Sequence, residues 1–341
     1  MKISIGTNVK DGPWGGGNLF AVNLRNHLNS KGYEVVFDLE DDDIDIILMT
    51  EPRKTSESSA YTHKECLDYK KFVKKDTVII HRINECDERK GTNFVNKYII
   101  YTNQIADHTV FVSNWLKDLY VEQGLKNINL NVILGGADDS IFNSSNFKPY
   151  NGKEKLRIVT HHWGANWNKG FEIYQKLDEM VSQPQWKEII EFTYIGNLPN
   201  KFSFKNSNYI EPLSGEDLVK ELKKNNLYIT ASLNEPSGNH HMEGALCGLP
   251  VLYINSGGTP EYCEGYGLNF EMASLEQKIY EFKKNYKNYN EKMKSYPHKS
   301  KKMCEKYEKL FHLTLEQKNK IKKFNGSNSE KKFYSFKKKW L

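Results

Sequence analysis

Two glutamates stand eight residues apart, at positions where both could contact one ligand. Glu235 follows an apolar run at 227–231 that suits a strand, and the Pro, Ser and Gly after it favour a turn. Glu243 lies in a segment that we expect to be helical from about Asn239. A carboxylate in a loop and a second one in the next helix can both accept hydrogen bonds from sugar hydroxyls. The spacing therefore predicts a site that holds both ends of a nucleotide sugar.

Two features near these glutamates favour phosphate binding. In open α/β sheets, ligands gather outside the carboxyl ends of the strands, where helix N-termini offer free N–H groups. The backbone at Gly238 and Asn239 begins the predicted helix of Glu243 and could bind a diphosphate in this way. Lys169 follows a predicted strand at 156–161, where a lysine can neutralise a diphosphate whose charge grows as it leaves.

The N-terminal half contributes a glycine cluster and a histidine. Between the first predicted strand and helix, residues 12–18 include three consecutive glycines, among them Gly16 and Gly17. Without a Cβ they let the backbone approach a phosphate or a sugar, and a plain tight turn is the alternative. His81 follows a predicted strand at 77–80, where it could donate to a sugar hydroxyl or be satisfied by nearby loop carbonyls.

Three adjacent acids at 41–43 could bind a divalent metal. We interpret them as a solvated turn, because an apolar run at 44–50 continues at once as a buried strand. We therefore expect no metal and no bound cofactor.

The segment from Glu235 to Val251 resembles the signature of the retaining family 4 glycosyltransferases of the GT-B fold. It has two glutamates separated by seven residues and then the run GALCGLPV, and the GGTPE sequence at 257–261 resembles the GGxPE loop that follows in that family. Further resemblances lie at 106–113 and 132–142. The order of these motifs is more specific than any one of them.

The resemblance implies two facing Rossmann-like α/β domains with a cleft between them. A chain of 341 residues exceeds the usual size of one core, which agrees with two domains. We expect an acceptor-side domain at 1–148, a nucleotide-sugar domain at 149–310 and a basic C-terminal helix or tail at 311–341. Chains of this family usually end in helices that return to the first domain.

The resemblance also implies a role for each candidate. Lys169 and the backbone of Gly238 and Asn239 would bind the diphosphate. Glu243 would bind the ribose, Glu235 the donor sugar, and His81 the same sugar from the opposite domain. The remaining candidates for donor binding are Gly16, Gly17, His162, Asn166, Gly196, Gly257 and Gly258.

One departure from the family pattern concerns the loop of Lys169. The family has an Arg before its Lys-Gly pair, and Gly164 stands at that place here. His162 or Asn166 would have to compensate, unless the loop is longer. The expected pair of cations on the diphosphate is therefore incomplete in this loop.

The implied activity is transfer of a sugar, with retention of configuration and without metal, from a nucleotide-diphosphate sugar to a hydroxyl of a glycan, a lipid-linked or another acceptor. One alternative is a nucleotide-sugar epimerase or hydrolase on the same fold. The other is a non-catalytic sugar-binding or scaffold protein, which the missing Arg favours.

Charge and cysteine content bear on partners and compartment. The net charge of +6 suits a nucleotide diphosphate or an anionic membrane surface, and we expect no nucleic acid. The five cysteines contain no C-x-x-C pair, which favours a reducing compartment. No signal peptide and no run of about 18 apolar residues is evident. We expect a cytoplasmic protein, with peripheral membrane contact through its basic aromatic tail as an option.

Overall fold

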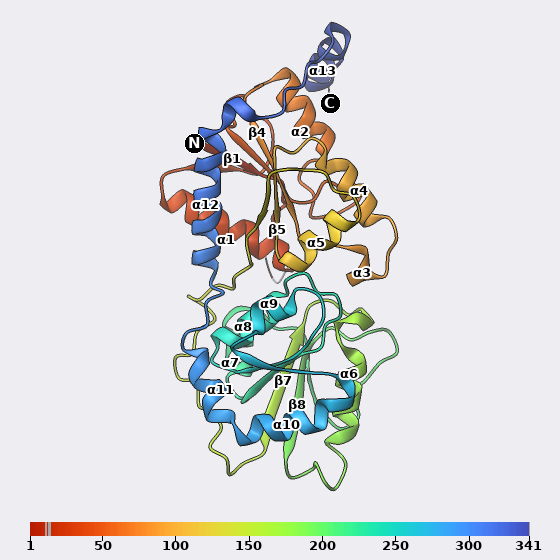
Figure 1. The fold of residues 1–341 in the computed structure, drawn as a ribbon, viewed down its shortest axis with the longest axis vertical. Helices are drawn as coiled ribbons and strands as arrows, with labels where there is room; N and C mark the ends of the chain where they lie inside the picture. The colour runs from red at the N-terminus through yellow and green to blue at the C-terminus, as the bar shows by residue number, and fades with distance from the viewer. Residues whose placement is uncertain (11, 13–14, 341) are drawn as a thin grey trace.

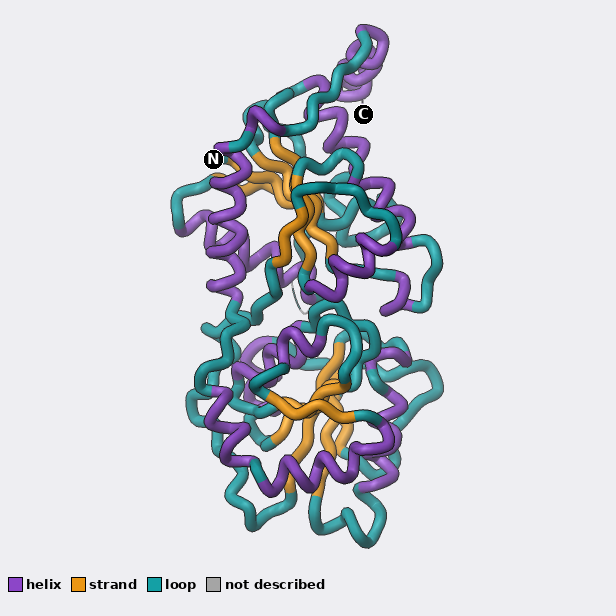
Figure 2. The backbone as a smooth tube through the Cα atoms, in the orientation of Figure 1, coloured by secondary structure: helices purple, strands orange, loops and turns teal. Residues whose placement is uncertain are grey.

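The computed structural model describes residues 1–10, 12 and 15–340, and only the backbone of 336–340. Residues 13 and 14 of the predicted glycine turn lie outside the described residues. Two six-stranded sheets lie one above the other, each with helices on both sides (Figures 1 and 2). The predicted α/β architecture with two Rossmann-like domains is confirmed.

The N-terminal sheet is parallel throughout and has the order β2-β1-β3-β4-β5-β6. Its strands are β1 (Lys2–Ile5), β2 (Glu34–Val36), β3 (Ile46–Met49), β4 (Val78–Ile83), β5 (His108–Phe111) and β6 (Leu130–Val132). Its helices are α1 (Gly16–Ser30), α2 (His63–Phe72), α3 (Asp87–Lys90), α4 (Val95–Asn103) and α5 (Asn114–Glu122).

The C-terminal sheet is also parallel and has the order β12-β11-β10-β7-β8-β9. Its strands are β7 (Leu156–His162), β8 (Ile190–Gly196), β9 (Asn208–Ile210), β10 (Leu227–Thr230), β11 (Val251–Ile254) and β12 (Gly267–Phe270). The helical segments around it are η1 (Trp167–Lys169), α6 (Phe171–Met180), α7 (Gly215–Leu222), α8 (Asn239–Leu246), α9 (Thr259–Cys263), η2 (Met272–Ser274), α10 (Leu275–Lys284) and α11 (Tyr286–Met293).

The central strands read as continuous apolar runs because helices cover both faces of each sheet. All four residues of β3 and of β10 are buried. In the second sheet the chain first adds β8 and β9 on one side of β7 and then places β10 on the other side. Such a reversal opens a crevice at the carboxyl ends of the two strands, where α/β proteins bind ligands. The candidate site should therefore lie at the ends of β7 and β10.

The chain returns to the first domain after α11. The helix α12 (Ser300–Glu316) runs beside α1 (Figure 1) and adds Met303, Tyr307 and Phe311 to the core of the N-terminal domain. The first core therefore includes residues that the expected division at 310 assigned to the second domain.

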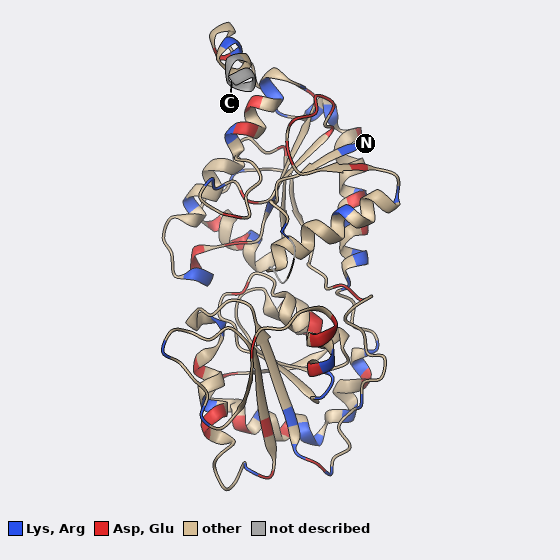
Figure 3. Ribbon diagram, turned by 180° about the vertical axis from the view of Figure 1, so that it is seen from behind, with Lys and Arg blue, Asp and Glu red and all other residues tan. Residues whose placement is uncertain are grey.

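Beyond α12, the short η3 (Lys318–Lys320) leads to α13 (Asn328–Trp340), which projects at the far end of the first domain (Figure 1). Figure 3 shows Lys and Arg interspersed with Asp and Glu over both domains. Within the described residues no helix combines the length and the apolar character needed to cross a bilayer.

Candidate functional site

The loops after β7 and β10 bring a lysine and a glutamate together. Gly170, with φ of 103°, ends η1, and a Cβ there would lie 2.6 Å from the Cβ of Ala231, next to the end of β10. Only glycine permits this approach, because it tolerates positive φ and has no side chain. Lys169 Nζ consequently lies 2.5 Å from Glu235 Oε2, and both residues are buried, with 7% and 3% of their surfaces exposed. Lys169, expected at the diphosphate, and Glu235, expected at the donor sugar, therefore form an ion pair with each other.

A second cation reaches Glu235 from the other domain. The Nε of Arg89, on α3, lies 3.3 Å from Glu235 Oε1. Burial by itself would raise the pKa of the Glu235 carboxyl, but the positive charges of Arg89 and Lys169 outweigh it and lower this pKa to about 2. The charge of Glu235 in turn raises the pKa of Arg89. The carboxylate is therefore ionised at neutral pH between two cations, and the sequence analysis did not include Arg89.

Glu243 lies on α8 and is held by a histidine. Its Oε2 is 2.8 Å from the Nε2 of His161, the penultimate residue of β7, and Glu243 is 6% exposed. The hydroxyl of Tyr228 lies 3.1 Å from the other ring nitrogen of His161. α8 packs closely on this tyrosine, since a Cβ at Gly244 would lie 2.2 Å from its ring. The chain Tyr228, His161, Glu243 therefore fixes the orientation of the second predicted carboxylate.

Further histidines are buried around the first turn of α8. His162 Nε2 lies 2.7 Å from the Tyr174 hydroxyl, and its ring centroid lies 4.4 Å from that of His240. Burial lowers the pKa of His162 and His240 far below the ordinary value, and that of His241 to about 3. These imidazoles are neutral at physiological pH. Sequence reasoning named only His162, although the repeated His-His pairs after β7 and at the start of α8 were a signal.

Within the described part of the chain, no group of three or more His, Cys, Asp or Glu side chains is arranged to hold a metal ion. Of the acids at 41–43, Asp41 and Asp43 take part in ion pairs, with Lys2 Nζ 3.0 Å from Asp41 and 2.8 Å from Asp43.

The N-terminus of α8 lies against the glycine segment of the first domain. Gly238 precedes the helix with φ of 79°, and Asn239 begins it, as predicted. A Cβ at Gly16 would lie 3.1 Å from the Asn239 side chain, so this glycine faces the start of α8 from the opposite domain. Gly17 has no such neighbour, since a Cβ there would meet nothing within 4 Å.

Three other glycines that we had predicted to bind the donor support the backbone around the site. A Cβ at Gly257 would lie 2.6 Å from the backbone of Glu235, and the N–H of Gly258 donates to the carbonyl of Glu235 at 2.9 Å. Gly196 ends β8, and a Cβ there would lie 2.0 Å from the carbonyl oxygen of His162. These close approaches account for glycine at each position and set where Glu235 and His162 lie.

The GGTPE loop also joins the two domains. Glu261 accepts hydrogen bonds from the backbone N–H groups of Asn114 and Trp115, both at 2.8 Å, and so caps α5 of the first domain. Next to it, the Tyr262 hydroxyl donates to the Val112 carbonyl at 2.5 Å. The loop that supports Glu235 therefore also fixes the position of the N-terminal domain.

His81 and Asn166 do not join this cluster. We had expected His81 to be the first loop residue, but β4 extends to Ile83, so His81 is a strand residue. Its side chain is 1% exposed and lies 3.1 Å from the Asn103 side chain inside the first domain, where burial lowers its pKa to about 3. The role expected for His81 at the donor sugar is therefore not supported. Asn166 is exposed and precedes η1, and its carbonyl accepts from the N–H of Lys169.

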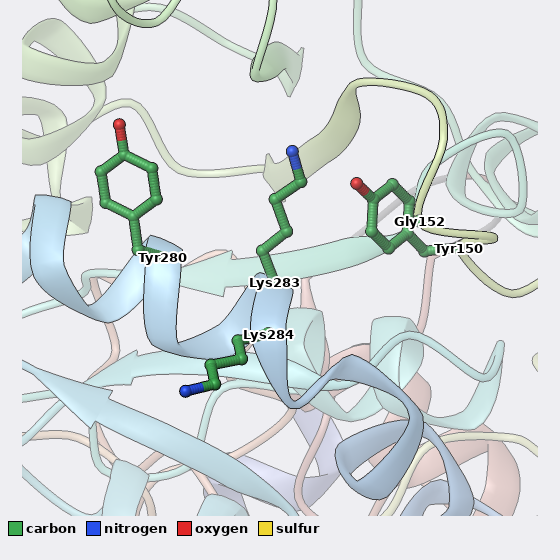
Figure 4. A pocket seen from close by; sticks show the side chains of 5 residues that line it. All are labelled: Tyr150, Gly152, Tyr280, Lys283 and Lys284. Carbon is green, nitrogen blue, oxygen red and sulfur yellow. The ribbon is translucent and has the colours of Figure 1, made fainter.

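A hollow of about 260 Å³ lies elsewhere, beside α10. Figure 4 shows Tyr280 and Lys283 pointing the same way from α10, with Lys283 between Tyr280 and Tyr150, while Lys284 points away. None of the predicted site residues lines this hollow.

Because Glu235 is ion-paired in the folded protein, we expect the free energy of unfolding to depend on pH in the acid range. The pKa of this carboxyl falls from 4.5 to about 2 on folding, so the pair stabilises the native state fully above pH 4.5 and is lost as pH falls towards 2. The contribution is about 3 kcal/mol. As pH falls from 4.5 to about 2, the free energy of unfolding measured with urea should decline less steeply in Glu235→Gln than in the parent. The matched control is Glu191→Gln on β8, and an equally steep decline in Glu235→Gln would contradict the account.

Comparison with solved structures gives several that are similar to this chain in fold. A glycosyltransferase from Rickettsia africae ESF-5 has a TM-score of 0.65 and 13% identity over 92% of this chain and 98% of that one. Anabaena Alr3699/HepE in complex with UDP-glucose has a TM-score of 0.66 and 13% identity over 92% and 100%. WaaG, a glycosyltransferase involved in lipopolysaccharide biosynthesis, has a TM-score of 0.62 and 11% identity over 91% and 99%.

No protein-family model and no curated protein sequence matches the chain. The structural likeness nevertheless extends over nearly the whole length of both partners, and it includes both parallel sheets. The chain has the GT-B fold.

Proposed function

We propose that this chain is a retaining, metal-independent glycosyltransferase that moves a sugar from a nucleotide-diphosphate sugar to a hydroxyl acceptor. The observation that carries the proposal is the buried cluster of Lys169 and Glu235 at the carboxyl ends of β7 and β10. The start of α8 follows the same loop as Glu235, and the first domain faces it through Gly16. Cations beside a helix N-terminus suit a diphosphate.

The structural neighbours support the choice of donor. Two further structures of Anabaena HepE are complexes with UDP and glucose and with UDP, at TM-scores of 0.66 and 0.67 to this chain. A nucleotide sugar would place its diphosphate by Lys169 and the backbone of Gly238 and Asn239. The ribose hydroxyls would then donate hydrogen bonds to Glu243, and hydroxyls of the transferred sugar would donate to Glu235.

In the proposed reaction, the bond between the sugar C1 and the leaving phosphate oxygen breaks, and a bond from C1 to the acceptor oxygen forms on the same face. The acceptor's proton passes to an oxygen of the departing diphosphate, so no side chain need form a covalent intermediate. Lys169 stabilises the negative charge that develops on the leaving group, which is a larger effect in the transition state than in the bound donor.

We propose a glycan or lipid-linked acceptor and a cytoplasmic protein with peripheral membrane contact. α13 carries exposed Lys331 and Lys332 beside Phe333, which is 70% exposed. Basic residues next to an exposed aromatic suit an anionic lipid surface.

The direct test is a transfer assay with UDP-, GDP- and ADP-sugars and a panel of glycan and lipid-linked acceptors, with the product anomer determined by NMR. We expect transfer with the donor's anomeric configuration preserved. Release of free sugar without an acceptor would instead support a hydrolase, and donor binding without turnover a non-catalytic protein. An inverted product would overturn the retaining mechanism.

Replacing Glu243 by alanine should weaken binding of the donor nucleotide roughly 10- to 100-fold, the range expected for a hydrogen bond to a charged group. Because the proposed contact is to the ribose, affinity for the free nucleoside should fall by a similar factor. Isothermal titration with the nucleoside and the nucleoside diphosphate measures both. Glu216→Ala, on the exposed face of α7, is the control. Unchanged affinity for both ligands would remove Glu243 from the site.

A further inference from the structure

The cation that approaches Glu235 from the first domain has no role in the function proposed above. Arg89 lies on α3, and its Nε is buried near Glu235 Oε1 at 3.3 Å. Within the described part of the chain this Nε has no hydrogen-bond partner, and its contact with Glu235 is an ion pair. A buried guanidinium N–H that makes no hydrogen bond within the protein is available to a ligand oxygen.

We propose that Arg89 and Lys169 together bind the diphosphate of the donor, one cation from each domain. This inference rests on the proposed function and adds a binding residue to it. Among the residues that the structure describes, Glu235 is the one negative charge that both cations contact, through its two carboxylate oxygens. The three side chains therefore carry one surplus positive charge, which a diphosphate between them would offset.

The position of Arg89 is fixed by contacts with the two loops that carry Lys169 and Glu235. The side-chain amide of Asn168 donates to the carbonyl of Arg89, and that of Asn234 donates to the carbonyl of Glu88, both at 3.3 Å. Each amide belongs to the residue directly before Lys169 or Glu235. Two cross-domain hydrogen bonds therefore hold α3 against the loops that carry the proposed phosphate ligand and the sugar ligand.

Within its own domain, Arg89 is oriented by Glu85. Glu85 Oε1 lies 3.5 Å from Arg89 Nη1, while Glu85 Oε2 lies 2.6 Å from Lys90 Nζ. Lys90 thus supplies most of the neutralisation of Glu85, and its side chain is 42% exposed. The two neighbouring cations of α3 differ in direction, because only Arg89 faces the second domain. The planar guanidinium of Arg89 could donate two N–H groups to oxygens of one phosphate, which a lysine at this place would not reproduce.

The test compares Arg89→Ala, Arg89→Lys and the control Lys90→Ala by isothermal titration. The probes are UDP, GDP and ADP, each beside its nucleoside, and thermal unfolding of each variant verifies the fold. For the diphosphate that the parent protein binds, Arg89→Ala should weaken affinity roughly 10- to 100-fold and leave affinity for the nucleoside unchanged. Arg89→Lys should recover part of the loss, and Lys90→Ala should bind as the parent does.

The loss in Arg89→Ala should also be smaller when Lys169 is already alanine, because the two cations contact the same phosphates. Equal affinity of the parent and Arg89→Ala for the diphosphate would overturn the inference and leave the proposed function intact. An equal loss for nucleoside and diphosphate would also overturn it, since the effect would then be structural. Failure of the parent to bind any of the three diphosphates would reject the proposed function and this inference with it.

Discussion

Lys169→Ala is expected to lower turnover roughly 10²- to 10³-fold, because the lysine stabilises charge that appears on the diphosphate only as the sugar leaves. The dissociation constant of the donor should rise much less, since the bound donor carries less charge on the leaving oxygen than the transition state does. Steady-state rates and titration with the intact donor separate the two effects. Glu235 keeps Arg89 as a partner in this variant, which limits the damage to the fold.

The matched control for this variant is Lys176→Ala, on the neighbouring helix α6, whose side chain donates to the Met272 carbonyl. It should leave turnover unchanged, whereas Lys169→Arg should retain an intermediate rate because a cation remains. Equal turnover in Lys169→Ala and the parent would contradict the role assigned to this lysine.

Gly257→Ala is expected to remove activity and to destabilise the C-terminal domain. The new Cβ would lie 2.6 Å from both the N and the O of Glu235, and the φ of 62° disfavours any residue with a side chain. The left-handed backbone alone costs about 1–2 kcal/mol. Displacing the Glu235 backbone adds about 1–3 kcal/mol more. Because this loop carries one partner of Lys169, the ion pair would be displaced as well.

Gly265→Ala separates these two costs. Gly265 has a φ of 83°, but a Cβ there would meet nothing within 4 Å. Its substitution should therefore carry only the backbone cost and leave transfer activity intact. Urea unfolding and donor turnover of the two variants give the comparison. If both variants were equally stable and equally active, the close packing of Gly257 on Glu235 would contribute neither to stability nor to transfer activity.

The strands and the helix that frame the site were predictable because their signals are local. The apolar run at 227–231 became β10, and the helix expected from about Asn239 begins there. Turn residues and continuous apolar runs are properties of a few neighbouring residues, so one sequence is enough to identify them. That Lys169 and Glu235 lie at one edge of the sheet could be expected, because each follows a strand and parallel strands place their carboxyl ends together.

His81 shows where local reading failed. A run of polar and charged residues after 80 indicated the end of a strand, yet β4 continues to Ile83. The buried polar side chains find partners far away in the sequence: His81 lies by Asn103, and the Arg82 guanidinium lies 3.9 Å above the Phe20 ring. Such compensation depends on tertiary packing and leaves no local pattern.

Arg89 was missed for a related reason. The family pattern indicates a second cation in the loop of Lys169, but Gly164 stands there, and His162 and Asn166 were the substitutes that the sequence offered. A Cβ at Gly164 would lie 3.5 Å from the Lys169 side chain, so there is contact but no charge at that position. The cation near Glu235 comes from α3 in the other domain. Only the docking of the two domains brings it there.

A crystal structure with a bound nucleoside diphosphate would show whether the donor binds at the carboxyl ends of β7 and β10. We expect phosphate oxygens within hydrogen-bonding distance of Lys169 Nζ and of the backbone N–H groups at the start of α8, and ribose hydroxyls at Glu243. A nucleotide bound elsewhere, for example in the hollow beside α10, with Lys169 and Glu235 still paired only to protein groups, would contradict it.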